Sequence, residues 1–295
     1  MQGRRERTIR KSVEVRGVGF LTGRDVTLRF HPAQAGHGIK FRRADCPGAP
    51  PIPARLEYTV PRERRTAIER NGTSIEMIEH VMAALAGLQI DNCLVELDAP
   101  EPPGMDGSSF AFAEAILSAG AVEQSTRRRL FVSGPVSIVA EKGRDRSEIT
   151  YRPVSRRTLA ISYHLDYGPR SPIRAQELTV EITPETFWNE LAYSRTFVLE
   201  HEAVQLRAAG YGARTSTKDL LVVGPHGPID NELRADDEFA RHKILDCLGD
   251  FALLGCDVEG HFCAYRSGHH LNRELIRKML AVASDESATG SRAAA

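Results

Sequence analysis

The stretch from Asp236 to Asp250 limits the possible folds more than any other part of the chain. Its apolar residues recur with the period of an α-helix, and acidic residues crowd its first turn, where they complement the helix dipole. On that helix His242, Asp246 and Asp250 fall at i, i+4 and i+8, so they form one polar stripe. A neutral imidazole and a carboxylate one turn apart can bind the same divalent cation, and they can equally form a solvated pair. These residues alone leave both interpretations open.

A second helix, expected from Thr73 to Leu88, carries another histidine. The pattern Thr73-Ser74-Ile75-Glu76 is that of a capping box, which predicts that the helix begins there. His80 lies opposite the apolar face, among small side chains that let another element approach closely. Burying Glu79 and His80 requires partners for both, because unpaired burial is costly. The alternative is a structural histidine bonded to a neighbouring carbonyl. The apolar face consists of Ile75, Ile78, Met82 and Leu85, and the small residues are Ala83, Ala84 and Gly87.

A third histidine-bearing segment, Ser267-Gly268-His269-His270, follows a predicted strand from His261 to Arg266. Groups placed at the end of a strand are often catalytic. The first two segments share an order of helix, glycine and strand, so His80–Leu97 and His242–Tyr265 can be aligned histidine on histidine. This alignment suggests an internal duplication.

Charge and composition argue against several classes of protein. The formal net charge is zero at neutral pH, so the chain as a whole shows no sign of a nucleic-acid or anionic-membrane partner. The five cysteines are odd in number and lack C-x-x-C spacing, which favours a reducing cytoplasm over a disulfide framework. The basic N-terminus has no apolar core typical of a signal peptide, and no apolar run approaches the roughly 18 residues that span a bilayer. We therefore expect a cytoplasmic protein without stable membrane insertion. No extra apolar stripe is evident, so we expect a monomer.

The length of 295 residues suits two domains. The segment Ser118–Arg129 is small, polar and then basic, which is typical of a linker. We predict one domain over residues 1–124, a second over 125–284, and a disordered tail over 285–295. The other expected elements are a strand, turn and strand within Thr8–Phe30, strands at Cys93–Leu97, Phe131–Val139, Glu148–Tyr151, Leu159–Leu165, Leu178–Ile182 and Leu220–Val223, and helices at Phe110–Ser118, Phe187–Ala192, Glu200–Ala209 and Asn272–Val282.

Six short motifs occur in a set order along the chain. They are Gly17-Val18-Gly19 with Thr22-Gly23, Ile78-Glu79-His80 with Ala83-Ala84-Leu85, Met105-Asp106-Gly107-Ser108, Arg195-Thr196-Phe197, Asp237-Glu238-Phe239 with Arg241-His242-Lys243-Ile244-Leu245-Asp246, and Ser267-Gly268-His269. In this order and spacing, from about Thr8 to Val282, the chain resembles the UDP-3-O-acyl-N-acetylglucosamine deacetylases. These are zinc amidases that catalyse the committed step of lipid A biosynthesis in Gram-negative bacteria.

The resemblance implies an α+β fold of two similar two-layer α/β sandwich domains, packed through their helices with the active site between them. It also implies one zinc ion per chain, bound by His80, His242 and Asp246, although Fe²⁺ could occupy the same ligands. Three protein ligands leave a fourth position for water, as in catalytic rather than structural zinc sites.

The same resemblance implies the other active-site roles. Glu79 matches the general base that takes a proton from water. His269 matches the histidine that faces the oxyanion and the leaving amine, and Asp250 matches the carboxylate that orients it. Thr196 matches a hydroxyl that helps to hold the tetrahedral intermediate. The substrate implied is a nucleotide sugar that carries a fatty acyl chain. The residues that match its contacts are Phe197 and Lys243.

Three positions depart from the family pattern. Leu21 stands where the family usually has a histidine, and Arg214-Thr215 stand where it usually has two glycines. The second stretch borders the family's passage for the acyl chain, so we expect these changes to affect substrate fit rather than the reaction. Two alternatives follow. One is a paralogue that hydrolyses a different nucleotide-sugar amide, and the other is a non-catalytic, zinc-stabilised binding protein.

Overall fold

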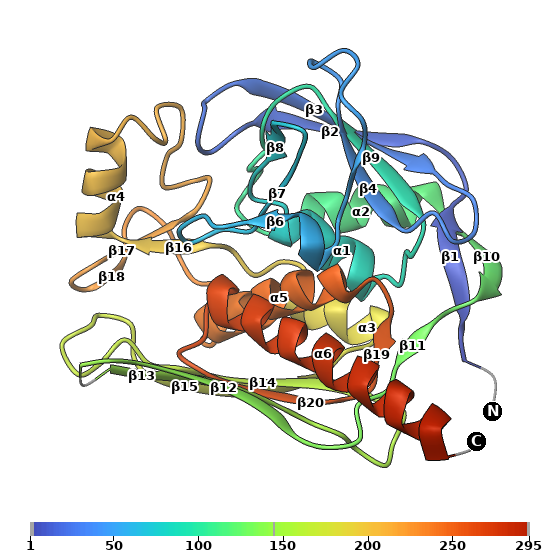
Figure 1. The fold of residues 1–295 in the computed structure, drawn as a ribbon. Coiled ribbons are helices and arrows are strands. Elements are labelled where there is room, and N and C mark those ends of the chain that lie inside the picture. The colour runs from blue at the N-terminus through green and yellow to red at the C-terminus, as the bar shows by residue number, and fades with distance from the viewer. Residues whose placement is uncertain (1–2, 144, 294–295) are drawn as a thin grey trace.

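The computed structural model describes residues 3–143 and 145–293. Figure 1 shows these residues in four layers, with a β-sheet on each outside and helices between them. The first half of the chain supplies one sheet with α1 (Glu79–Gly87) and α2 (Phe110–Ala119), and the second half supplies the other sheet with α5 (Glu238–Phe251) and α6 (His269–Ala293). The predicted α+β fold, with two sheet-and-helix halves packed through their helices, is confirmed.

The sheet of the first half has five strands in the order β2-β3-β9-β4-β5. Apolar residues alternate along β3, so Val26, Leu28 and Phe30 are buried against the helices while the residues between them face outward. The ring of Phe30 lies 6.5 Å from that of Phe112 on α2. The strands are β2 (Val13–Val18), β3 (Asp25–Pro32), β4 (Ile39–Arg43), β5 (Ile52–Pro53) and β9 (Cys93–Leu97).

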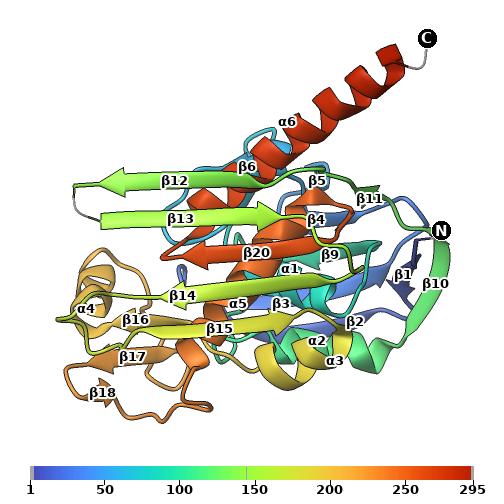
Figure 2. The same cartoon turned by 90° about the horizontal axis from the view of Figure 1, so that it is seen from below.

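The sheet of the second half also has five strands, in the order β12-β13-β20-β14-β15, and Figure 2 shows it face on. Ile161, Tyr163 and Leu165 of β14 alternate inward, as the sequence pattern predicted. Phe251 of α5 stacks on Phe262 of β20 with ring centroids 4.2 Å apart. The strands are β12 (Val136–Lys142), β13 (Asp145–Arg152), β14 (Leu159–Leu165), β15 (Gln176–Glu181) and β20 (Gly260–Tyr265).

The two sheets have the same topology. In each half the last strand enters the centre of the sheet, antiparallel to the second strand and parallel to the third. The helix before that strand is α1 in the first half and α5 in the second. This shared order supports the internal duplication that the histidine alignment suggested.

Each half carries an insertion at the same point, between its fourth strand and the helix that follows. The first insertion (residues 54–78) and the second insertion (residues 182–237) lie beside each other in Figure 1. The first contains a short 3-10 turn (Leu56–Tyr58), β6 (Thr59–Val60), β7 (Ala67–Arg70) and β8 (Thr73–Ile75). The second contains α3 (Pro184–Thr186), a π-helical turn (Phe187–Leu191), β16 (Phe197–Leu199), α4 (Glu200–Ala208), β17 (Leu221–Gly224) and β18 (Gly227–Pro228).

The predicted capping box at Thr73–Glu76 is wrong. Thr73–Ile75 form β8, which pairs with β7 across the turn Asn71-Gly72, and α1 begins only at Glu79. Both turn residues have positive φ, 51° and 75°, which suits a two-residue hairpin turn. The hairpin overrides the local helix signal because it places Ile75 opposite Ile68, and both side chains are fully buried.

The predicted linker Ser118–Arg129 contains the end of α2, the start of β11 (Arg129–Leu130) and the whole of β10 (Ala121–Thr126), which pairs with β1 (Arg5–Ile9). Its polar side chains have partners there, since the Ser125 hydroxyl donates to the Glu6 carboxylate (3.0 Å). The predicted boundary after residue 124 therefore falls within a strand, and the division into two domains stays a prediction. Beyond β10, β11 pairs with β19 (Asp257–Val258).

The last helix extends beyond its predicted end. The sequence predicted a helix over Asn272–Val282 and a disordered tail over 285–295, whereas α6 runs from His269 to Ala293. Residues 283–293 contain no proline, so nothing in this stretch is incompatible with a helix, although Gly290 and three serines give it a low helix propensity. Residues 294–295 lie outside the described residues. None of the helices in the described ranges combines the length and the apolarity needed to cross a bilayer.

Candidate functional site

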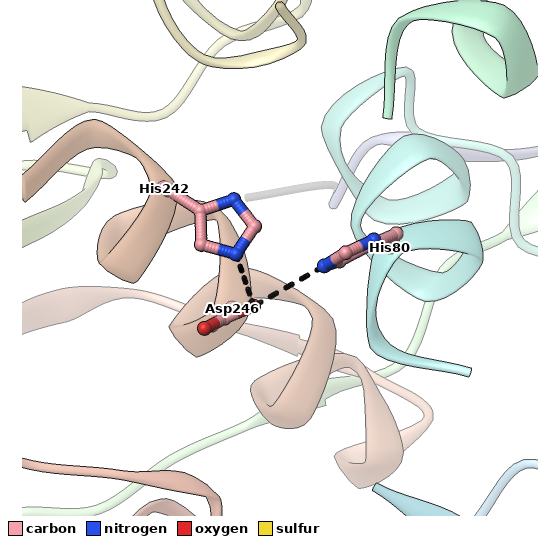
Figure 3. Close-up of side chains that lie close together, drawn as sticks. All are labelled: His80, His242 and Asp246. Carbon is pink, nitrogen blue, oxygen red and sulfur yellow. Dashed lines mark ion pairs between the residues drawn. The ribbon is translucent and has the colours of Figure 1, made fainter. Parts of the chain in front are cut away.

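Two crossing helices bring the three predicted metal ligands together. His80 comes from α1, and His242 and Asp246 come from α5. The Asp246 Oδ1 atom lies 3.7 Å from His80 Nε2 and 3.5 Å from His242 Nε2, and Figure 3 shows the three side chains pointing at one another. All three are buried, and one ligand atom of each lies within 4.8 Å of the others. His242 and Asp246, one turn apart on α5, therefore lie next to a histidine that precedes His242 by 162 positions in the sequence.

The helices approach this closely because α5 has a glycine at the crossing. A Cβ atom added to Gly249 would lie only 2.2 Å from the main-chain oxygen of Glu79. At the other end of α1, a Cβ atom added to Gly87 would lie 2.2 Å from the ring of Phe187 in the second insertion. The predicted close approach to the small-residue face of α1 is therefore made, at Gly87, by Phe187 of the second insertion.

The donor atoms suit a divalent cation. Asp246 Oδ1 is buried and has no hydrogen-bond partner among the described residues, while Oδ2 accepts from Lys243 Nζ at 2.7 Å. Burial opposes the ionised form of Asp246, but Lys243 holds the pKa of this carboxyl well below its usual range. His242 Nδ1 bonds to the Ser194 carbonyl at 3.0 Å, which leaves Nε2 free to bind a cation. Burial lowers the pKa of His242 to about 4, so the imidazole is neutral, the form that binds metals.

A second buried carboxylate, Glu79, lies beside this cluster. Its Oε2 atom accepts the Thr66 main-chain N–H at 3.0 Å, and its Oε1 atom lies 3.9 Å from His269 Nε2. Burial raises the pKa of Glu79, against the opposing attraction of His269. A carboxylate with a raised pKa exchanges protons closer to neutral pH, as a general base must.

His269 is held by a carboxylate of its own. His269 Nδ1 donates to Asp250 Oδ2 at 2.8 Å, and the same oxygen accepts from Asn272 Nδ2 at 2.8 Å. Burial would lower the pKa of His269, but Asp250 outweighs it and raises the pKa to about 9. His269 is therefore an imidazolium at neutral pH, with Nε2 turned toward Glu79 and Asp246, 3.9 Å from each.

These groups open on a cleft of about 900 Å³ between the two halves. Thr196 and Phe197 line it, and both follow Arg195, whose buried guanidinium is paired with Glu238 at 2.8 Å. That pair fixes the start of β16, and the Phe197 ring lies 6.1 Å from the His242 ring. Among the other residues lining the cleft are Lys243, His270, Tyr167, Leu199 and Arg266.

The two insertions meet at the cleft. Arg64 of the first insertion donates to the carboxylate of Glu202 on α4, and both side chains line the cleft. Arg65 lies over the Tyr211 ring of the second insertion, 6.0 Å from its centroid. The equivalent insertions of the two halves thus contact each other, and both contribute residues to the lining of the cleft.

The family model described as UDP-3-O-acyl N-acetylglycosamine deacetylase (LpxC) matches residues 6–281. The chain belongs to this family. A UDP-3-O-acyl-N-acetylglucosamine deacetylase of Myxococcus xanthus is 38% identical over 93% of this chain and 86% of its own length. Proteins of the same name from Citrifermentans bemidjiense and Pseudomonas entomophila are 37% and 35% identical, over 93% and 94% of this chain and 88% and 90% of their own lengths. The resemblance predicted from the six motifs is confirmed.

Within this deacetylase fold, the positions that depart from the family pattern lie together outside the cleft. The Leu21 main-chain N–H donates to the Glu101 carboxylate, with distances of 3.0 and 2.9 Å to its two oxygens. Arg214 donates to the Gly23 carbonyl at 3.1 Å and pairs with Asp25 at 3.0 Å. Arg214 therefore braces the turn between β2 and β3, and the predicted effect of these positions on substrate fit stays a prediction.

Sequence reasoning missed three polar residues that are hydrogen-bonded within this buried cluster: Thr66, Asn272 and Arg273. Asn272 and Arg273 follow His269 by three and four positions on α6, a helical spacing that could have revealed them. Thr66 immediately precedes β7 and gives no local signal, because its partners lie 13 and 184 positions away.

Proposed function

We propose that this chain removes the N-acetyl group of UDP-3-O-(acyl)-N-acetylglucosamine to give UDP-3-O-(acyl)-glucosamine and acetate, the committed step of lipid A biosynthesis. Family membership makes the chain a deacetylase that hydrolyses an amide. The observation that carries the proposal for this site is the position of His269 Nε2, 3.9 Å from both Glu79 and Asp246. A base, an acid and a cluster of cation ligands thus open on one cleft large enough for a nucleotide sugar.

We propose zinc as the cation, held by His80, His242 and Asp246, with Fe²⁺ as the alternative occupant. Asp246 Oδ1, which has no hydrogen-bond partner among the described residues, and one imidazole nitrogen each from His80 and His242 form a donor set that suits either ion. Zinc, when bound, supplies a Lewis acid that makes hydroxide available near neutral pH.

The proton transfers are assigned to Glu79 and His269. Glu79 takes a proton from the attacking water, a task that its burial and raised pKa favour. His269 donates a proton from Nε2 to the leaving nitrogen, because its Nδ1 proton is committed to Asp250. Asp250 keeps His269 charged and correctly turned, so it orients the acid.

The remaining roles concern the substrate. Thr196, at the start of β16, is proposed to donate its hydroxyl to the developing oxyanion. Phe197 and Lys243 are proposed to contact the substrate, since both line the cleft next to His242 and Asp246. The partner is then a small nucleotide-sugar lipid, and no nucleic acid is needed.

The replacement Glu79→Gln tests this assignment. It keeps the side-chain volume and removes the base, so kcat should fall by about 100-fold or more while metal content stays at the wild-type value. Glu69→Gln, on β7 and away from the cleft-lining residues, is the matched control and should keep wild-type kcat. Wild-type turnover in Glu79→Gln would contradict the assignment of Glu79 as the base, and an absence of turnover in the wild type would favour the non-catalytic alternative. A strong preference for the substrate without its acyl chain would favour the paralogue.

We further propose that the chain acts as a monomer in the cytoplasm, without stable membrane insertion. The formal net charge of zero offers no attraction to an anionic membrane, and the five free cysteines suit a reducing cytoplasm. The proposal of a monomer rests on the sequence, which shows no extra apolar stripe. Light scattering on the purified chain measures the oligomeric state, and a mass of twice 32.6 kDa would contradict a monomer.

A further inference from the structure

One buried residue outside the six motifs contacts both the proposed base, Glu79, and the carboxylate that orients the proposed acid, Asp250. Thr66 is 1% exposed and belongs to the first insertion. Its main-chain N–H donates to Glu79 Oε2 at 3.0 Å, and its hydroxyl donates to Asp250 Oδ1 at 2.5 Å. Glu79 comes from α1 and Asp250 from α5, so this threonine links catalytic groups of the two halves.

The direction of the hydroxyl hydrogen bond follows from its second partner. Arg273 Nη1 lies 3.2 Å from Thr66 Oγ1, and a guanidinium can only donate. The hydroxyl therefore accepts from Arg273 through a lone pair, and its single proton goes to Asp250 Oδ1. The positive charge of Arg273 polarises the Thr66 hydroxyl, and this strengthens the hydrogen bond that the hydroxyl donates to Asp250.

The Thr66 hydroxyl is one of three hydrogen-bond donors that hold the Asp250 carboxylate in its orientation. Oδ2 accepts from His269 and from Asn272, and Oδ1 accepts from Thr66. Asp250 is fully buried, so loss of a donor leaves part of an ionised carboxylate without compensation. Without the Thr66 hydroxyl the carboxylate can rotate toward other donors, and the imidazole bonded to its other oxygen turns with it.

We infer that Thr66 is a positioning residue of the reaction, whose hydroxyl fixes the plane of Asp250 and thereby the direction of His269 Nε2. Its main-chain N–H fixes Glu79 at the same time, so base and acid are set from one anchor point. This role rests on the proposed function, in which Glu79 and His269 move the protons. Supporting residues that orient an active-site group typically contribute about 10- to 100-fold to activity.

The test compares hydroxyl-bearing and hydroxyl-free residues at position 66. Thr66→Val keeps the shape and the main-chain N–H but removes the hydroxyl, and we expect kcat to fall about 10-fold or more with KM within about twofold. Thr66→Ser keeps both donors and should restore kcat to within about threefold of wild type. If Thr66→Val fails to fold, Thr66→Ala takes its place and should show the same loss of kcat. The matched control is Thr59→Val, which removes a hydroxyl bonded to the Leu56 carbonyl in the same insertion and should leave kcat unchanged.

A second measurement does not depend on turnover. In protein labelled with ¹⁵N-histidine, the downfield proton on Nδ1 of His269 reports its hydrogen bond to Asp250. We expect this resonance to shift in Thr66→Val and to stay in place in Thr66→Ser and Thr59→Val. If the wild type did not deacetylate the substrate, the proposed function would fail while this comparison still tested Thr66. The inference is overturned by an unmoved resonance with wild-type kcat in Thr66→Val, by a serine variant as impaired as the valine variant, or by a change confined to KM.

Discussion

Replacing Gly249 by alanine should pull the proposed metal ligands apart without altering any of them. The added Cβ would lie 2.2 Å from the Glu79 oxygen, 2.9 Å from its carbonyl carbon and 3.2 Å from its Cα. Non-bonded heavy atoms settle at about 3.5 Å or more, so the backbones of α1 and α5 must separate by roughly 1 Å. His80 would move with α1, while His242 and Asp246 would move with α5.

A displacement of this size is larger than the site can absorb. Metal–ligand distances tolerate only about 0.2 Å, and a misplacement of about 1 Å in an active site can cost about 100-fold in rate. Overpacking of this kind costs about 1–3 kcal/mol, whereas alanine gains at most about 1 kcal/mol over glycine within a helix. We therefore expect Gly249→Ala to lower stability, metal content and activity together.

Metal per chain after equilibration with a weak chelator, Tm and kcat/KM measure these three effects. Gly134→Ala is the matched control, because a Cβ at Gly134 would meet nothing within 4 Å and its φ is not in the left-handed region. If Gly249→Ala kept full metal, wild-type Tm and wild-type kcat/KM, the close helix crossing would not be what holds the ligand set.

Three other outcomes are expected. His242→Ala should lose tightly bound metal, and full occupancy in that variant would contradict the ligand assignment. Burial raises the pKa of Glu79, and Asp250 raises the pKa of His269 to about 9 against the effect of burial, so kcat/KM should fall on the acid side as Glu79 gains a proton and above about pH 9 as His269 loses one. A profile that stays flat from about pH 5 to above pH 9 would count against this acid–base pair. Glu238→Ala leaves the Arg195 guanidinium buried without its carboxylate and should cost about 3–5 kcal/mol in urea unfolding, whereas a cost below about 1 kcal/mol would contradict the importance of that pair.

Local periodicity was sufficient for much of the fold. β14 has the bounds that its alternation predicted, Leu159–Leu165, because one of its faces is buried and the other is not. The helix predicted from Asp236 is α5, because its apolar face and acidic first turn agree. Where two local signals competed, as at Thr73, the turn Asn71-Gly72 decided the outcome by pairing β8 with β7.

The sequence predicted only those site residues that a helical spacing or the family resemblance identifies. The histidine and carboxylate spacing on α5 was compatible with a solvated pair as well as with a metal site, and only the family resemblance favoured the metal. The close approach of α5 to α1 depends on Gly249, which meets the main chain of Glu79 next to His80, a contact that no local sequence pattern contains. Thr66 lies even further from any local signal, because its importance arises only where α1, α5 and α6 converge.

The shared topology of the halves has a consequence for assembly. The proposed ligands are split between them, one on α1 and two on α5, so a separated half offers too few donors to retain a cation tightly. An ion that binds only the docked form adds about RT ln(1 + [M]/Kd) to the free energy that keeps the halves joined. Metal occupancy in a purified sample would then count the molecules whose halves have come together correctly, even before any turnover is measured.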